Sequence, residues 1–306
     1  MLVFATSDKG GTGRSVTSSN VAYRRALQGS DVCYLDFDFG SPTAGAIFNI
    51  ERVLQGTPTD GLHSYLRGEA DDQPMRLDVW DESDRSGLRG RPPGAGRLVL
   101  FPGDRGGGEF ASTPETVERC TDLLLRLEEE FELSIVDLSA GRSYATDIAL
   151  EVTADPRLRG VTTRWLVFHR WTRQHIIAAA GLVYGERGLL DAGAKRGHDR
   201  AELNRSIRFV RTAVVDPGSP ELEGLRPVQL AWLEKTNQEL QALAGQQKVG
   251  RTVMLGQVPL DPVLQWREQL ISDQDAHTHR TANYQTVEAF EEIAKRLTED
   301  TAWEGL

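Results

Sequence analysis

Residues 2–15 read Leu2-Val3-Phe4-Ala5-Thr6-Ser7-Asp8-Lys9-Gly10-Gly11-Thr12-Gly13-Arg14-Ser15, an apolar run followed by a glycine-rich loop, and a helical pattern comes next. Glycines let backbone N–H groups approach a polyphosphate closely, and the helix directs its positive N-terminal end at the same point. A hydroxyl at the exit of such a loop can bind Mg²⁺. The stretch therefore predicts a strand, a phosphate-binding loop and a helix, in that order.

The loop departs from the ordinary P-loop pattern G-x-x-x-x-G-K-[ST] at two positions. Asp8 stands where the first glycine is usual, and Arg14 stands where lysine is usual. Lys9 accounts for the difference, because K-G-G-x-G-[KR]-[ST] resembles the deviant Walker A motif of the ParA/MinD family of P-loop ATPases. That motif carries an additional signature lysine at this place.

Three further stretches resemble motifs of the same family and occur in the family's order. Residues 31–40, DVCYLDFDFG, look like a second strand that ends in an Asp-x-Asp switch I. Residues 134–141, SIVDLSAG, are similar to the Walker B strand and switch II pattern D-[ST]-P-A-G, with Ser139 where proline is usual. Residues 254–261, MLGQVPLD, are similar to the late strand and P-x-D loop beside the nucleotide base. The matches run from residue 2 to about 297.

The fold that these motifs imply is α/β, with three layers: a mostly parallel twisted sheet and helices on both faces. Strand and helix patterns alternate along the chain, which is typical of parallel βαβ units. Strands are expected at residues 2–6, 31–36, 97–101, 133–137, 164–168, 207–215 and 251–256. Helices are expected at residues 15–28, 114–130, from about 172, 227–244, 262–270 and 282–298.

The length of 306 residues fits a single P-loop domain, residues 1–306, with a variable insertion at about 41–96. Within that insertion, residues 85–96 are rich in Gly, Pro and Arg and predict a flexible surface segment. Residues 186–206 are polar, and we expect them to be irregular.

The resemblance implies that the chain binds ATP with Mg²⁺. Ser15 would supply a hydroxyl to the metal, Asp137 would bind it through water, and Asp36 would lie near its water shell. The residues expected to contact the nucleotide are Lys9, Gly10, Gly11, Thr12, Gly13, Arg14, Ser15, Val16, Gly141, Asp216, Pro259 and Asp261.

Three residues are expected to act in hydrolysis. Asp38 aligns with the family's carboxylate that positions the attacking water. Lys9 resembles the lysine that reaches across a nucleotide-sandwich dimer to the partner's phosphates, which implies a nucleotide-dependent homodimer. Arg14 takes the place of the lysine on the β- and γ-phosphates, and its planar fork binds phosphate but is bulkier and differently aimed. We therefore expect nucleotide binding with slow or altered turnover.

The base preference stays open at Asp216, where many relatives have Asn. An ionised Asp only accepts hydrogen bonds, which suits the amino group of adenine and also N1–H and N2–H₂ of guanine. The resemblance favours ATP over GTP.

The composition argues against several classes of protein. A net charge of −10 and a pI near 5.2 disfavour a protein that coats nucleic acid. No apolar run reaches the ~18 residues of a membrane span, and the acidic segment 297–306 differs from the basic amphipathic helix that anchors MinD-like proteins. Cys33 and Cys120 lack metal-like spacing and are expected to be buried in a reducing cytosol. We expect a cytoplasmic protein without a membrane anchor.

A local basic patch is compatible with this acidic whole. Its residues would form either a solvated face of mixed charge or a patch for nucleic acid or an acidic partner. The densest basic cluster comprises Lys195, Arg196, Arg200, Arg205, Arg208 and Arg211.

Three functions are compatible with these features. The first is a switch that dimerises on ATP and Mg²⁺, recruits or positions an unknown protein partner, and hydrolyses ATP slowly. The second is a degenerate P-loop protein that serves as an interaction scaffold, which Asp8, Arg14 and Ser139 favour. The third and least favoured is a metabolic relative such as an ATP-dependent synthetase, for which no second-substrate motif is evident.

Overall fold

A mostly parallel sheet forms the middle layer of the computed structural model, which describes residues 1–70, 73–216, 218–219, 222 and 224–304. Across these residues the sheet has eight strands in the order β3-β4-β2-β5-β1-β6-β7-β8. The short edge strand β3 runs antiparallel to β4, and the other neighbouring pairs are parallel. The strands are β1 (Leu2–Thr6), β2 (Val32–Phe37), β3 (Leu77–Asp78), β4 (Leu98–Phe101), β5 (Leu133–Leu138), β6 (Thr163–Arg170), β7 (Ile207–Val214) and β8 (Met254–Pro259).

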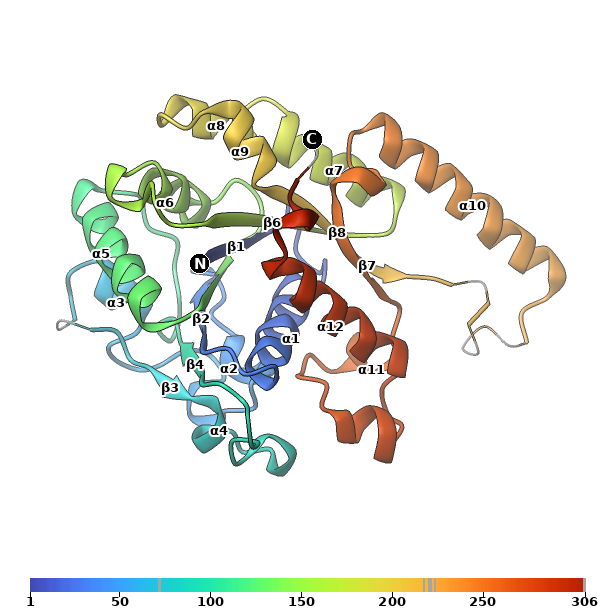
Figure 1. The fold of residues 1–306 in the computed structure, drawn as a ribbon, viewed down its shortest axis with the longest axis horizontal. Helices are drawn as coiled ribbons and strands as arrows, with labels where there is room; N and C mark the ends of the chain where they lie inside the picture. The colour runs from blue at the N-terminus through green and yellow to red at the C-terminus, as the bar shows by residue number, and fades with distance from the viewer. Residues whose placement is uncertain (71–72, 217, 220–221, 223, 305–306) are drawn as a thin grey trace.

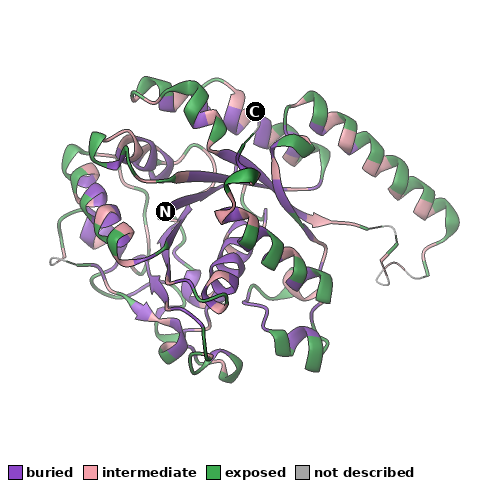
Figure 2. Ribbon diagram, viewed as in Figure 1, coloured by how far each residue is buried: buried purple, intermediate pink, exposed green. Residues whose placement is uncertain are grey.

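Helices cover both faces of this sheet (Figure 1). One face carries α1 (Arg14–Leu27), α2 (Ala44–Ile47), α4 (Val79–Glu82) and α12 (Tyr284–Thr298). The other carries α3 (Leu62–Leu66), α5 (Pro114–Glu130), α6 (Tyr144–Thr153), α7 (Arg173–Tyr184), α8 (Leu189–Lys195), α9 (Arg200–Arg205) and α10 (Pro227–Gln246). Figure 2 shows buried strands between helices whose outer sides are exposed. The predicted three-layer α/β fold is confirmed.

Helix α12 lies closely on the edge strand β8. Gly256 makes this possible, because a Cβ at that position would overlap the side chain of Ile293. Ile293 and Phe290 are fully buried on the inner side of α12. The α12–β8 contact closes the end of the sheet beyond β7.

Several local predictions were wrong. Residues 186–206 are not irregular, because they form α8 and α9, which bury Leu189, Leu190 and Leu203. The helix expected at 262–270 is reduced to α11 (Val263–Trp266).

Most residues of the segment 85–96 are exposed, as predicted for a surface segment, and a few contacts attach it to the rest of the protein. Leu88 and Ala95 are buried, and Arg85 forms an ion pair with Asp275. The surrounding region 41–96 also supplies the unpredicted strand β3 to the sheet.

The predicted basic cluster is not a continuous surface patch. Arg208 and Arg211 are each 1% exposed. Arg196 pairs with Asp147 and Glu151, and Lys195 pairs with Asp191, so their charges are locally balanced. The cluster was defined by closeness along the sequence, so it combined buried residues of strand β7 with residues in or next to helices α8 and α9.

Two other predictions concern burial and the membrane. Cys33 and Cys120 are both free and buried, as predicted. Within the described part of the chain, no helix combines the length and the apolar character needed to cross a bilayer.

The close contact at Gly256 leads to a prediction about stability. Gly256→Ala should lower the free energy of unfolding by about 1–3 kcal/mol, because the added methyl group forces α12 away from β8. Urea denaturation measures the change. Gly160→Ala is the control, since a Cβ there meets no atom within 4 Å.

A double-mutant cycle identifies the cause. Combined with Ile293→Ala, the Gly256→Ala change should cost clearly less than it does alone, because the overlapping side chain is gone. Simple additivity of the two changes would show that the contact with Ile293 is not what Gly256 protects.

Candidate functional site

The candidate site lies where the carboxyl ends of three neighbouring strands meet. β5 is paired with both β1 and β2, and this register sets Asp137 beside Ala5 on one side and Asp36 on the other. The glycine-rich loop follows β1, and Asp38 follows β2. Parallel pairing thus brings together motifs that are separated by about a hundred residues in the sequence.

The glycine-rich loop is shaped for an anion. Gly11 and Gly13 have φ values of 70° and 75°, a left-handed conformation that favours glycine. Thr212 of β7 holds the loop from outside, because its Oγ1 donates to the carbonyl of Thr12. The structure therefore accounts for two of the predicted glycines by their backbone conformation.

Free donors point out of this loop. Among the described residues, no group accepts a hydrogen bond from the backbone N–H of Arg14, Ser15 or Val16 in the first turn of α1. The half-buried Lys9 has no ion-pair partner in the described part of the chain. Unpaired N–H groups at a helix N-terminus form a site for a phosphate group, and Lys9 adds a positive charge to the same loop.

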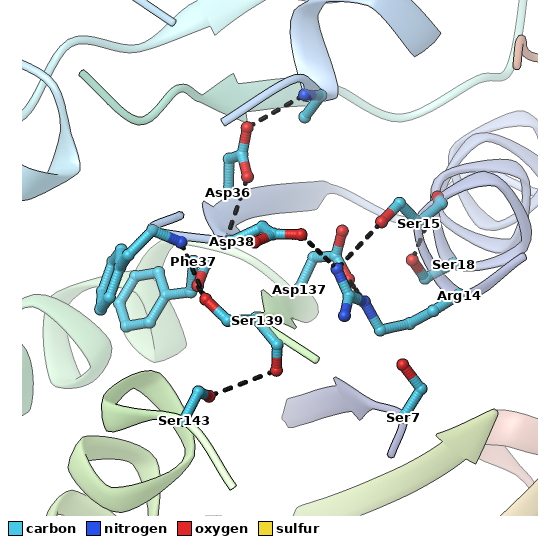
Figure 3. Close-up of polar contacts among 12 residues, drawn as sticks. Ser7, Arg14, Ser15, Ser18, Asp36, Phe37, Asp38, Asp137, Ser139 and Ser143 are labelled. Atoms are coloured by element: carbon cyan, nitrogen blue, oxygen red, sulfur yellow. Dashed lines mark hydrogen bonds and ion pairs between the residues drawn. The ribbon is translucent and has the colours of Figure 1, made fainter. Parts of the chain in front are cut away.

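The side chain of Arg14 joins the groups of the acidic edge (Figure 3). Its Nε donates to Oδ1 of Asp137 at 2.5 Å, and its Nη2 donates to Oδ2 of Asp38 at 2.8 Å and to Oγ of Ser15 at 3.2 Å. The side chain is 6% exposed. Burial disfavours its charge, but Asp137 and Asp38 outweigh burial and raise the pKa of the guanidinium. Arg14 is therefore a fixed cation between two carboxylates.

Asp36 differs from the other two acids. Burial raises its pKa to about 8, and the charges of Asp137 and Asp38 act in the same direction. Its oxygens accept from the N–H groups of Ala44, at 3.0 Å, and Asp38, at 3.3 Å. Figure 3 shows its carboxyl group directed away from Arg14. The side chain of Asp36 therefore anchors the chain after β2, and its raised pKa favours the neutral form.

The predicted magnesium donors have the right chemistry but are engaged. The Ser15 hydroxyl and the Asp137 carboxylate are oxygen ligands of the kind that Mg²⁺ takes. Both accept hydrogen bonds from Arg14, so Mg²⁺ fits these residues only after the guanidinium has moved. No cluster of three or more His, Cys, Asp or Glu side chains among the described residues would hold a metal alone. Phosphate oxygens would have to complete the coordination.

Ser139 connects the segments after β2 and β5, a role that the sequence did not reveal. Its Oγ accepts from the N–H of Phe39 at 3.0 Å and lies 3.3 Å from the carbonyl of Phe37. Its own N–H donates to that carbonyl at 3.1 Å. Proline, the usual residue of the motif, could not make these bonds. Ser139, which replaces the proline of the family motif, thus bridges the segments after β2 and β5.

Gly141 touches the loop directly. Its N–H donates to the carbonyl of Ser7 at 2.7 Å, so this N–H is not free for a phosphate in the present arrangement. The segments after β1 and β5 are held together by this bond.

The residues expected at the base are only partly brought together. Asp216 and Pro259 line one cavity of about 460 Å³ between the ends of β7 and β8. Asp261 is buried instead, and its carboxylate accepts from Thr286 and from the backbone N–H of Asn283. The side chain of Asp261 thus holds the N-terminus of α12, and its place beside the base stays a prediction.

Comparison with known proteins gives one match by sequence. The chain is 28% identical over 167 residues to the septum site-determining protein MinD of Neisseria meningitidis serogroup B. The match covers 52% of this chain and 55% of the relative, so it spans about half of each protein. No family model matches the chain.

Solved structures match over nearly the whole chain. The MinC:MinD cell division protein complex of Aquifex aeolicus has a TM-score of 0.61 at 14% identity, covering 97% of this chain and 95% of that one. A putative plasmid partition protein of Borrelia burgdorferi bound to AMPPNP has a TM-score of 0.59 at 14% identity, covering 97% of each chain. Cobyrinic acid a,c-diamide synthase of Mycobacterium smegmatis, with bound ADP and magnesium, has a TM-score of 0.56 at 13% identity, covering 97% of this chain and 94% of that one. The chain has a ParA/MinD-like P-loop fold.

The bridge at Ser139 leads to a prediction. Ser139→Ala should lower the free energy of unfolding by about 1–2 kcal/mol, because the buried N–H of Phe39 loses its acceptor. Hydrogen exchange followed by mass spectrometry should show faster exchange at residues 37–41. Thr298→Ala, which removes a solvent-facing hydroxyl, is the control. Unchanged exchange at residues 37–41 in Ser139→Ala would show that the bridge does not hold this segment.

Proposed function

We propose that the chain is a ParA/MinD-like nucleotide switch, which binds ATP with Mg²⁺, dimerises in that state, recruits or positions a protein partner, and reopens after slow hydrolysis. The observation that carries this proposal is the meeting of the Lys9 loop with Asp38 and Asp137 at one edge of the sheet. The likeness to a MinC:MinD complex and to a partition protein bound to AMPPNP supports it.

Binding of the triphosphate would use the free donors of the loop. The N–H groups of Arg14, Ser15 and Val16 are unpaired, and the ammonium of Lys9 is available to a phosphate of the same or a second subunit. A lysine that serves a second subunit must be accessible, and Lys9 is only half-buried. Nucleotide binding and dimerisation would therefore depend on the same loop.

Nucleotide binding would require a rearrangement of Arg14. Its fork is suited to phosphate as well as to carboxylate, so a bound phosphate competes with Asp137 and Asp38 for the same donors. As Arg14 turns to phosphate, the Ser15 hydroxyl and the Asp137 carboxylate become free to bind. A bound Mg²⁺ would neutralise charge on the phosphates, and Asp38 would be free to orient a water molecule.

A second candidate function is a scaffold that binds nucleotide weakly or not at all. The specific observation in its favour is the pair of short ion pairs of Arg14, which engage two of the carboxylates that hydrolysis would need. The hydroxyl of Ser15 is engaged as well. If these contacts persist, the fold remains while the chemistry is lost.

Light scattering tests the switch. The native chain should be a monomer without nucleotide or with ADP, and a dimer with ATP and Mg²⁺. Lys9→Ala should abolish the ATP-dependent dimer because the phosphates lose a cation from the second subunit. Asp38→Ala should prolong the dimer because the attacking water is no longer oriented.

The controls separate loss of folding from loss of function. Lys235→Ala removes an exposed lysine of α10 and should leave dimerisation unchanged. A mass that ignores nucleotide in all four proteins contradicts the switch and favours the scaffold.

Replacing Arg14 distinguishes the two candidates. In Arg14→Lys the ammonium cannot hold both carboxylates in a fork, so a switch restrained by Arg14 should gain turnover by about tenfold, equal to ~1.4 kcal/mol of activation free energy. Phosphate release with saturating ATP and Mg²⁺ measures this gain.

The matched control is Arg24→Lys, another buried arginine of α1, which pairs with Asp273 and Glu291 away from the loop. It should leave turnover unchanged even if stability falls. Equal turnover in the native chain and Arg14→Lys, with both chains folded, is the outcome that the scaffold predicts.

A further inference from the structure

A second cavity adjoins the one lined by Asp216 and Pro259, at the edge of the sheet formed by β8. Its volume is about 530 Å³, and it is bounded by β7, β8, α10 and α12. This volume lies in the range of small-molecule sites. Its polar lining comprises Arg211, Asp216, Asn237, Gln241, Arg251, Gln257, Glu292 and Arg296, and none of the loop residues 7–16 takes part.

Arg211 is a buried cation in the wall of this cavity with poorly satisfied donors. It is 1% exposed and stacks on the ring of Trp171, 3.9 Å from its centroid. Its hydrogen bonds to Oε1 of Gln241 and to the carbonyl of Val249 are long, both 3.4 Å, and its Nε has no partner among the described residues. Burial, followed by the nearby charge of Arg251, lowers its pKa to about 10, so the group is charged at neutral pH.

The other buried arginines of the described chain are better satisfied. Arg14, Arg24 and Arg164 each form an ion pair with a carboxylate. Arg208, on the same strand as Arg211 and equally buried, also has one unpaired nitrogen, Nη2, but it donates to three backbone carbonyls at 2.9–3.0 Å. A buried charge without such partners costs several kcal/mol. Arg211 is therefore a buried charge without strong partners, and it lines this cavity.

Two further arginines add positive charge to the same cavity. The side chain of Arg251 has no ion-pair or hydrogen-bond partner in the described part of the chain, and Arg296 makes only a 3.5 Å contact with the carbonyl of Met254. Asp216 and Glu292 also line the cavity, but both are exposed and neither pairs with these arginines. The lining thus holds three arginines and two carboxylates, of which Arg211 is buried, Arg296 is half-buried, and Arg251, Asp216 and Glu292 are exposed.

We propose that this cavity binds a small organic anion through a carboxylate or phosphate group held by Arg211, with Arg251 and Arg296 contributing charge. The unpaired Nε of Arg211 is buried, so the side chain would have to turn toward the cavity before Nε and the adjacent Nη could meet two oxygens of such a group. The amide groups of Gln241 and Asn237 supply further polar contacts to the body of the ligand. The cavity shares Asp216, Gln257 and Glu292 with the neighbouring cavity that contains the expected base contacts, but its three arginines lie outside that neighbour.

Isothermal titration calorimetry at low ionic strength tests the proposal, with succinate and inorganic phosphate as separate probes. At least one probe should bind saturably to the native chain, and the preferred probe identifies the anionic group. Arg251→Gln, at the surface, should weaken binding by about tenfold, and Arg211→Met should abolish it. The exposed Arg159→Gln is the control for overall charge and should bind as the native chain does.

Stability separates a ligand-binding arginine from a structural one. Arg211→Met should leave the free energy of unfolding of the ligand-free protein unchanged or raise it, since an unbalanced buried charge is removed. Arg208→Met should lower it, because three carbonyls lose their donor, yet the folded fraction should still bind the probe. If Arg211→Met fails to fold, Arg251→Gln and Arg296→Gln carry the test.

Two outcomes overturn the proposal. One is the absence of saturable binding of either probe to the native chain. The other is binding that survives Arg251→Gln and Arg211→Met but is weakened by Lys9→Ala, since that pattern assigns the anion to the glycine-rich loop instead. Neither outcome bears on ATP-dependent dimerisation, so the two proposals fail separately.

Discussion

The arrangement of the site depends on the balance of charge around Arg14. β-sheet pairing brings Asp36 and Asp137 side by side, and the chain after β2 adds Asp38. Charges of one sign are costly when they are close and poorly hydrated, and the structure meets this cost in two ways. Burial raises the pKa of Asp36 and favours its neutral form, whereas Asp38 and Asp137 share the guanidinium of Arg14. Any ligand that recruits Arg14 must therefore supply a replacement cation to the carboxylates.

The sequence predicted the parts of the fold that depend on the local chain. Apolar runs ending in Gly or Asp marked the central strands, and the glycine-rich loop marked the start of α1. Features that depend on long-range contacts were missed. Asp261 resembled a base contact, but its carboxylate holds the N-terminus of α12. Arg208 and Arg211 resembled surface charges because their burial results from packing of distant elements, which a local count of charges does not contain.

Within the site, the same distinction holds. The residues of the loop and the acids at the strand ends were identifiable because their spacing is local and their strands are parallel neighbours. The direction in which each side chain points was not identifiable from the sequence. The contacts of Arg14 with Asp137 and Asp38 could not be predicted from the sequence, and neither could the bridge from Ser139 to Phe39. Such directions are set by which partners the fold supplies, and sequence spacing does not fix them.

The hydrogen bonds and ion pairs within the site also define how its three segments are coupled. Gly141 donates to Ser7 of the loop, Ser139 accepts from Phe39 after β2, and Arg14 joins Asp38 and Asp137. A phosphate that draws Arg14 away weakens the link between the segments after β2 and β5, while Ser139 still holds them together. The bond between Gly141 and Ser7 can then open without separating the other two segments. A ligand that binds the open form better shifts this balance by only its difference in affinity for the two forms. In the proposed switch, the short ion pairs of Arg14 would therefore lower apparent nucleotide affinity and, in the same measure, would make the state of the site depend on nucleotide.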